Sequence, residues 1–243
     1  MATRRALKHI HISPTQIPYS TGAAVQHVLV KNYLDSKRVP DIVPRPVPTL
    51  LTMEFLPVYT FGRRQQHDEE SIRKIEILKT KVPEVTSVVT TRGGQTTFHG
   101  PGQLVAYPII DLKEFNLSSK CYVRMLEDTA IELLKGFGLR AKTTENTGVW
   151  LSDSEKIASI GVHLRRYITS HGVAINASTN LSYFDQIVAC GLPESKATSI
   201  EQAARDEWER QMAGVNNPIQ ELGNRLADIL QEKLDHQFEH RKP

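Results

Sequence analysis

Apolar residues spaced three and four positions apart predict amphipathic helices in several parts of the chain. One such stripe indicates a helix over residues 21–36, and a charged segment at 69–79 has a similar pattern. The C-terminal stripe begins at Asn217, an N-cap residue followed by Pro218 in the first turn and Gln220 at the capping-box position. Another long helix is expected to end at Gly136 and Gly138. Its apolar face consists of Tyr122, Met125, Leu126, Ala130, Leu133, Leu134 and Phe137.

Short runs of β-branched and aromatic residues, most of them bounded by Gly or Pro, predict strands. They lie at 50–55, 58–61, 85–91, 104–110, 148–151, 157–164 and 167–175, after an extended piece around 10–12. Residues 181–188 are predicted to form a short helix or turn. Hairpin-like strand pairs with a few flanking helices favour an α+β fold with a mixed, mainly antiparallel sheet. A doubly wound sheet would alternate strands and helices more regularly.

Length and composition limit the organisation of the chain. The 243 residues are 40% hydrophobic, which favours one domain over residues 1–243. Four prolines within residues 39–48 predict an irregular surface loop, interpreted as an insertion. The net charge of +3 comes without blocks of like charge, so neither a nucleic-acid nor a membrane-surface partner is expected. Uncharged apolar stretches are far shorter than the roughly 18 residues of a membrane span.

The cysteine count indicates a reducing compartment. Only Cys121 and Cys190 are present, which provides no disulfide framework, and no cluster of metal ligands is visible. Arg4, Arg5 and Lys8 precede the first acidic residue, a pattern typical of a mitochondrial presequence. A mitochondrial location is therefore expected, with a cytoplasmic one as the alternative.

Residues 92–103, with the sequence RGGQTTFHGPGQ, combine glycines with an arginine and a histidine between two predicted strands. Glycines let a backbone approach a ligand closely, and the adjacent arginine suits an anionic or thioester-bearing substrate. Tight hairpin turns alone would explain the same glycines. The segment is neither a GxGxxG nor a Walker loop, so nucleotide phosphates are not implied.

Together with Tyr107, this segment resembles the signature of the lipoyl(octanoyl) transferase family, RGG-x-x-T-x-H-G-P-G-Q-x-x-x-Y. The resemblance covers the chain from about Pro57 to Ile200. It continues through residues 57–63, 147–150, 156–162, 169–176 and 189–191. The loop at 39–48 departs from the family pattern, and His163 and Arg165-Arg166 acquire no role from it.

The resemblance implies a fold shared with biotin and lipoate protein ligases. It also implies transfer of an octanoyl group from octanoyl-acyl carrier protein to a lysine of lipoyl-dependent proteins, the first step of endogenous protein lipoylation. The expected acceptors are lipoyl domains such as glycine cleavage H protein and 2-oxoacid dehydrogenase E2 subunits. No metal or cofactor is expected, because the 4'-phosphopantetheine arm arrives on the carrier protein.

The resemblance also assigns residues to the site. Cys190 matches the acyl-accepting cysteine, and Lys156 matches the lysine whose ammonium favours the ionised, nucleophilic thiol. From residue type alone, each would more often be an inert small side chain or a solvated surface charge. The expected substrate-binding residues are Arg92, Gly93, Gly94, Gln95, Thr96, Thr97, Phe98, His99, Ser159, Ile160, Gly161, Gly172, Val173 and Ala174.

Several further assignments stay open at this stage. His99 is expected either to orient the substrate or to donate to its carbonyl oxygen, and His171 is expected to be structural. Gly161 and Gly172 could instead simply permit strand bends. The backbone N–H groups of Cys190 and Gly191 are a candidate oxyanion hole. Cys121 begins an amphipathic helix next to the apolar Tyr122, shows no basic constellation and is expected to be inert.

Two other functions compete with acyl transfer. One is an ATP-dependent lipoate or biotin protein ligase, which would activate a free acid as an adenylate. The other is a non-catalytic module that binds lipoyl domains. The presence of both Cys190 and Lys156 favours the transferase over each of them.

Overall fold

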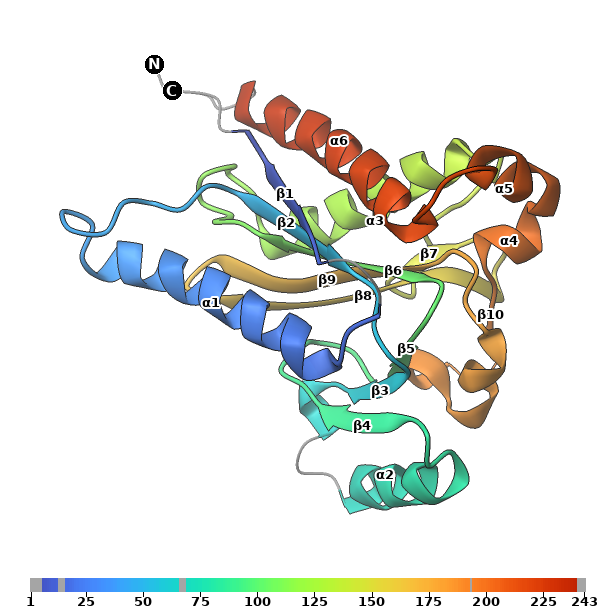
Figure 1. Ribbon diagram of the computed structural model, residues 1–243. Helices are drawn as coiled ribbons and strands as arrows, with labels where there is room; N and C mark the ends of the chain where they lie inside the picture. The colour runs from blue at the N-terminus through green and yellow to red at the C-terminus, as the bar shows by residue number, and fades with distance from the viewer. Residues whose placement is uncertain (1–5, 13–15, 66–68, 193, 240–243) are drawn as a thin grey trace.

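A seven-stranded mixed sheet forms the centre of the computed structural model, which describes residues 6–12, 16–65, 69–192 and 194–239 (Figure 1). The strands run in the order β1 (Lys8–His11), β2 (Thr49–Met53), β6 (Gln103–Ile109), β9 (Ile168–Asn176), β8 (Glu155–Arg165) and β10 (Lys196–Ala197), with β7 (Val149–Trp150) also paired to β8. The outer pairs β1–β2 and β8–β10 are parallel, and the other pairs are antiparallel.

A second, three-stranded sheet consists of β3 (Val58–Phe61), β4 (Thr86–Val89) and β5 (Thr97–His99). Strands β3 and β4 are parallel, and the helix α2 (Glu69–Lys81) connects them. Strand β5 returns antiparallel to β3. The small sheet and α2 lie together at one end of the molecule (Figure 1).

Helices cover both faces of the large sheet. The helices α3 (Ser119–Lys135) and α6 (Pro218–Glu239) pack side by side on one face, and α1 (Tyr19–Arg38) crosses the other (Figure 1). Two short helices, α4 (Ile200–Ala203) and α5 (Arg205–Met212), connect β10 to α6. Among the described residues, no helix is both long and apolar enough to cross a membrane.

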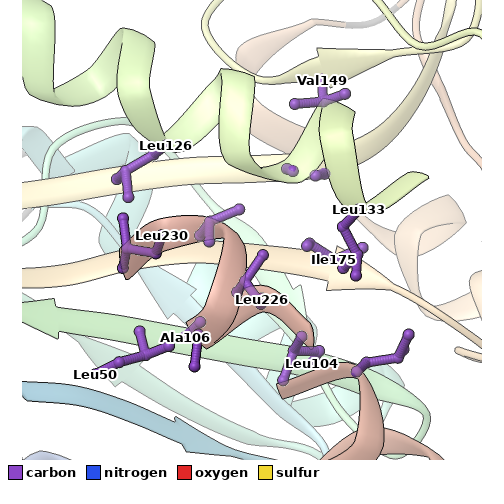
Figure 2. Packing of buried hydrophobic residues seen from close by; sticks show 14 of the residues in the cluster. Leu50, Leu104, Ala106, Leu126, Leu133, Val149, Ile175, Leu226 and Leu230 are labelled. Atoms are coloured by element: carbon purple, nitrogen blue, oxygen red, sulfur yellow. The ribbon is translucent and has the colours of Figure 1, made fainter. Parts of the chain in front are cut away.

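Alternation along the strands separates two cores. Leu104 and Ala106 of β6 point toward α3 and α6, where they meet Leu226 and Leu230 (Figure 2). Between them, Val105 belongs to the core under α1. Successive side chains of a strand point to opposite faces, so a run of apolar residues can fill both cores. Burying one leucine completely contributes about 1.5–3 kcal/mol to stability.

Most of the predicted elements are present, and the mixed α+β fold is confirmed. The side-chain oxygen of Asn217 accepts the Gln220 N–H at 2.9 Å, so the predicted N-cap of α6 is confirmed. The strands do not form one sheet, however, because β3, β4 and β5 form their own. Strand β5 also lies inside the segment that the sequence suggested was a loop, and α4 and α5 were not predicted.

The N-terminal basic residues divide into two groups. Lys8 is exposed and pairs with Thr49 in the large sheet. Arg4 and Arg5 lie outside the described residues. Residues 39–48 form the expected irregular connection, and Arg45 anchors it to Glu114 through an ion pair of 2.7 Å.

Candidate active site

A cavity of about 220 Å³ lies between the middle of β8 and β9, the glycine-rich segment and the turn that carries Cys190. Cys190 and Lys156 both line it, so residues that are 34 positions apart in sequence face the same space. The lining residues are Arg92, Gly94, Gln95, Thr97, His99, Val105, Tyr107, Asn146, Thr147, Lys156, Ser159, Ile160, Gly161, His171, Gly172, Val173, Ala174, Cys190 and Leu192.

Cys190 occupies a strained turn. It lies in the short helical turn Ala189–Gly191 with φ 55° and ψ 16°, the left-handed region that disfavours residues with a Cβ atom. Its N–H donates to the carbonyl oxygen of Thr96 at 2.8 Å, which ties this turn to the glycine-rich segment. Its Sγ lies 3.8 Å from the hydroxyl oxygen of Ser159 on β8. Two neighbouring segments therefore fix the position of the thiol.

The expected oxyanion hole at this turn is wrong. The N–H of Cys190 already donates to Thr96, and the N–H of Gly191 donates to the carbonyl oxygen of Val188 at 3.1 Å. Neither donor is available to a substrate oxygen. Gly191 has another role, because a Cβ there would lie 2.3 Å from Oε1 of Gln95. Glycine therefore lets the Gln95 amide pack against this turn.

Lys156 is a buried cation held by backbone and aromatic groups. Its Nζ donates to the carbonyl oxygen of Thr147 at 3.0 Å and lies 4.9 Å from the centre of the Trp150 ring. Gly148, with φ 133°, lies directly against the lysine, because a Cβ there would be 2.5 Å from Lys156 Cε. Contact with an aromatic face and a carbonyl stabilises an ammonium without neutralising it. The described residues include no carboxylate within ion-pair distance of Lys156.

Arg92 is a second buried cation in the cavity. Its guanidinium donates to the carbonyl oxygen of Thr60 at 2.6 Å, to the Thr60 hydroxyl at 2.8 Å, and to the carbonyl oxygen of Gly93 at 3.0 Å. Burial lowers the pKa of Arg92, while nearby Cys190, followed by Tyr107 and Tyr19, opposes that shift. Arginine remains protonated under such conditions. The described residues that line the cavity include neither Asp nor Glu, so its field favours a thiolate or an oxyanion.

A hydrogen-bond network fixes the tautomer of His99. The amide nitrogen of Gln103 donates to the carbonyl oxygen of Phe98 at 3.2 Å and to Oδ1 of Asn176 at 2.9 Å. Gln103 Oε1 must therefore accept from Nδ1 of His99, 2.7 Å away. This leaves Nε2 as an acceptor, so donation from His99 to a substrate carbonyl does not fit the network. Burial, then the charge of Arg92, lowers the pKa of His99 to about 4, so the ring is neutral.

His171 also faces the cavity, although the sequence suggested a purely structural role. It adopts φ 56°, and its backbone N–H donates to Oε1 of Gln26 on α1 at 2.6 Å. Its ring packs edge-on against Tyr107, with 5.3 Å between the ring centres. Burial, reinforced by Arg92, lowers the pKa of His171 to about 3. His171 is thus a neutral wall residue beside the second cation.

The structure separates the expected substrate-binding residues into two groups. Gly93, Thr96 and Phe98 do not line the cavity. Thr96 holds Cys190 through its carbonyl oxygen, and Phe98 is fully buried and stacks on Tyr183. Those that do line it are Arg92, Gly94, Gln95, Thr97, His99, Ser159, Ile160, Gly161, Gly172, Val173 and Ala174.

Gly161 and Gly172 line the cavity and also pack against backbone. A Cβ on Gly172 would lie 2.2 Å from the carbonyl oxygen of Ala106, and one on Gly161 would lie 3.0 Å from that of Gly93. These glycines therefore both line the cavity and permit local backbone packing, the two roles that the sequence left open. Each allows close packing of neighbouring segments while leaving space in the cavity.

Sequence reasoning missed several lining residues. Asn146 and Thr147 precede β7, and Leu192 follows the cysteine turn. Val105 and Tyr107 lie on the β6 face that points toward α1. Together with Ile160, Val173 and Ala174, the apolar members give the cavity a hydrophobic wall that suits an alkyl chain. Strand alternation could have identified Val105 and Tyr107, because they share a face.

Comparisons with known proteins identify relatives of this chain. The family described as Lipoyl protein ligase A/B catalytic domain matches residues 18–217. A "Probable octanoyltransferase" of Schizosaccharomyces pombe is 49% identical over 184 residues, which cover 75% of this chain and 80% of that protein. The "Octanoyl-[acyl-carrier-protein]:protein N-octanoyltransferase LIPT2, mitochondrial" of Danio rerio is 41% identical and covers 82% of this chain and 84% of its own length.

A solved structure shows the same fold at low sequence identity. The crystal structure of lipoate-protein ligase A bound with ATP superposes with a TM-score of 0.56 at 13% identity, and the match covers 93% of this chain and 95% of that one. The fold expected from the sequence is therefore confirmed. At this identity, the similarity extends to the fold alone.

Proposed function

This chain belongs to the octanoyltransferase family, with the Lipoyl protein ligase A/B catalytic domain, and from that premise we propose how it moves an octanoyl group. The donor is octanoyl-acyl carrier protein, and the acceptor is a lysine of a lipoyl domain. Cys190 carries the acyl group between them as a thioester. The observation that carries this proposal is a cysteine that opens onto a cavity with two buried cations, where no carboxylate is found among the lining residues that the structure describes.

In the first half-reaction, the Cys190 thiolate attacks the carbonyl carbon of the donor thioester. A carbon–sulfur bond to Cys190 forms as the bond to the carrier sulfur breaks. The carrier sulfur leaves with a proton from the Lys156 ammonium. Arg92 stabilises the attacking thiolate, since a nearby cation favours the ionised form of a thiol.

In the second half-reaction, the acceptor amine attacks the acyl-enzyme. A carbon–nitrogen bond forms, Cys190 leaves as a thiolate, and the amine proton passes to the neutral Lys156. The cycle therefore returns the proton that Lys156 gave to the carrier thiol. His99 Nε2 accepts a hydrogen bond from the incoming amine, because the Gln103 network holds its proton on Nδ1.

We propose that the reaction needs neither a metal nor a cofactor of the enzyme. The donor is already a thioester, and exchange of one thioester for another conserves its energy. The 4'-phosphopantetheine arm belongs to the carrier substrate. ATP would add nothing to such a donor, whereas a free carboxylate would need activation.

The acceptors are proposed from the chemistry of the family. Glycine cleavage H protein and 2-oxoacid dehydrogenase E2 subunits carry the lysine that such a reaction modifies. The relative from Danio rerio is named as a mitochondrial protein, and we place this enzyme in the mitochondrion rather than the cytoplasm.

The choice of acyl donor distinguishes this function from the ligase alternative. A lipoate-protein ligase of the same fold has been solved with bound ATP, so ATP is the cosubstrate to test. Purified enzyme should modify an apo lipoyl domain when given octanoyl-acyl carrier protein alone. It should not do so with free octanoate, ATP and magnesium. Mass spectrometry of the lipoyl domain reports both conditions. Modification that required ATP and survived in Cys190→Ala would show a ligase, and no modification from either donor would indicate a non-catalytic module.

A further inference from the structure

The hairpin between β8 and β9 has unusual residues in its turn. Arg165 pairs with Ile168, so the loop consists of Arg166 and Tyr167 alone. Their φ angles are 50° and 69°, and a two-residue type I′ turn requires positive φ at both positions. Asn and Gly normally occupy these positions, because a Cβ is disfavoured there. Arg166 and Tyr167 are therefore strained and exposed, and residues held in such conformations cluster at functional sites.

The side chains around this tip form a basic surface. Arg63, Arg165 and Arg166 are exposed, and none has an ion pair with a carboxylate among the described residues. Burial, followed by the charges of Arg63 and Arg165, lowers the pKa of His163, so both arginines lie within electrostatic range of this ring. We call Arg63, His163, Arg165 and Arg166 the basic hairpin surface.

Helix α1 extends this surface. A groove of about 400 Å³ separates α1 from the hairpin, with Val30 and Leu34 among the residues that line it. Arg165 and Arg166 line its other side. On α1, the single carboxylate of Asp35 pairs with both Lys31 and Arg38, so the helix side of the groove keeps an excess positive charge that adds to that of the hairpin.

His163 and Arg165 of the basic hairpin surface lie on the face of β8 that contacts the Cys190 thiol. Side chains two residues apart share a face of a strand, so Ser159, Gly161, His163 and Arg165 form one row along β8. Ser159 contacts Cys190, and both Ser159 and Gly161 line the cavity. At about 3.3 Å per residue, Arg165 lies roughly 20 Å along the strand from Ser159. This row of side chains therefore extends from the cavity that contains Cys190 to the exposed hairpin arginines.

We propose that the basic hairpin surface, with the adjoining α1 groove, is where an acidic acyl-carrier protein docks to deliver its thioester. The inference rests on the proposed function, in which such a carrier is the donor. A pantetheine arm has about fifteen bonds along its length, equivalent to about five extended residues, so the carrier's body can sit far from Cys190. An acceptor lysine has five bonds between Cα and Nζ, and its protein must approach the cavity itself. The distance favours the carrier as the occupant of this surface.

Charge reversal at the tip tests the proposal. The variant carries Arg165→Glu and Arg166→Glu, and the control carries Lys120→Glu and Lys233→Glu on the helices of the opposite face. Acylation of Cys190 is measured with octanoyl-acyl carrier protein and with octanoyl-pantetheine, which lacks the carrier's body. We expect the KM for the carrier protein to rise at least tenfold in the hairpin variant only, with the pantetheine reaction unchanged in both. Added salt should raise the wild-type KM for the carrier alone.

Each other outcome has a distinct meaning. An unchanged carrier KM in the hairpin variant would overturn the proposal, as would an equal loss in the control. A loss confined to transfer onto the lipoyl domain would assign the surface to the acceptor instead. Equal loss with both donors would indicate damage to the fold, and Arg165→Gln with Arg166→Gln would then have to show the carrier-specific rise in KM. If the wild type accepted an acyl group from neither donor, the proposed function itself would fail, and the docking inference with it.

Discussion

The backbone N–H of Cys190 donates to the carbonyl oxygen of Thr96 at 2.8 Å. This bond joins the cysteine turn to the glycine-rich segment, and it holds Cys190 in a left-handed conformation with its thiol beside Ser159. Thr96 thus supports the nucleophile from outside the cavity. Gln95 reinforces the same junction by packing on Gly191.

Gly191→Ala should inactivate the enzyme more than it destabilises the fold. An alanine Cβ would collide with the Gln95 amide and push this side chain, which lines the cavity, away from the cysteine turn. Positive φ at residue 191 adds a cost of about 1–2 kcal/mol. Gly214→Ala is the matched control, because Gly214 has φ 75° and open space around its Cβ position. Urea unfolding should show similar losses for both variants, and only Gly191→Ala should lose tenfold or more in kcat/KM. Equal activities would mean that the turn tolerates displacement.

Lys156→Met should slow both the alkylation of Cys190 at pH 7 and acyl transfer. Removing the ammonium leaves the thiolate with Arg92 as the remaining buried cation in the cavity. Lys156→Arg should preserve alkylation better than turnover, since a guanidinium keeps the charge but does not surrender a proton. The comparison is followed with iodoacetamide and mass spectrometry, with Lys120→Met as a surface control. An unchanged alkylation rate in Lys156→Met would mean that the lysine does not act on the thiol.

Gln103→Glu should move the acid limb of the pH–rate profile to higher pH. The wild-type His99 has a pKa of about 4, so its Nε2 remains an acceptor through the neutral range. A carboxylate 2.7 Å from Nδ1 would favour the imidazolium and raise that pKa. NMR titration of His99 should show the increase directly, and transfer at pH 6 should fall severalfold. A profile that stayed in place while the NMR pKa rose would exclude His99 as the acceptor for the amine.

Stability should fall as the pH drops from 6.5 toward 4. His99 and His171 have depressed folded pKa values, about 4 and about 3, so the unfolded chain binds protons in this window and the folded protein does not. Each such histidine costs about 1.4 kcal/mol per pH unit below 6.5, or about 2 kcal/mol by pH 5. Urea unfolding at pH 7 and pH 5 measures the difference. His171→Asn, which tolerates positive φ, should lose about half of the contribution from this pair. The same pH dependence in the variant would contradict the burial argument for His171.

The sequence predicted which segment forms the site better than it predicted which side chains of that segment face the cavity. The run from Arg92 to Gln103 was identified by its unusual glycines, and most of its predicted residues do line the cavity. The exceptions have a physical cause. Strand β5 within this run alternates its side chains, so Phe98 enters the small core while Thr97 and His99 face the cavity. The strand has three residues, too few for a periodic signal.

Long-range contacts explain the rest of what the sequence did not reveal. The tautomer of His99 depends on Gln103 and, through it, on Asn176, which lies on another strand. The loss of the expected oxyanion donors depends on Thr96, which is 94 residues from Cys190 in the chain. The short helix α5 was missed because its face toward the core has two buried residues, Trp208 and Met212. Two positions at helical spacing are too few to predict a helix from a single sequence.

The mass of the intact protein after incubation with octanoyl-acyl carrier protein tests most directly whether Cys190 carries the acyl group. One octanoyl group should be added to the wild type and to Cys121→Ala, whose exposed cysteine lies on α3. No stable adduct should form on Cys190→Ala. A stable adduct on Cys190→Ala, or its absence from a wild type that still modifies the lipoyl domain, would contradict the account.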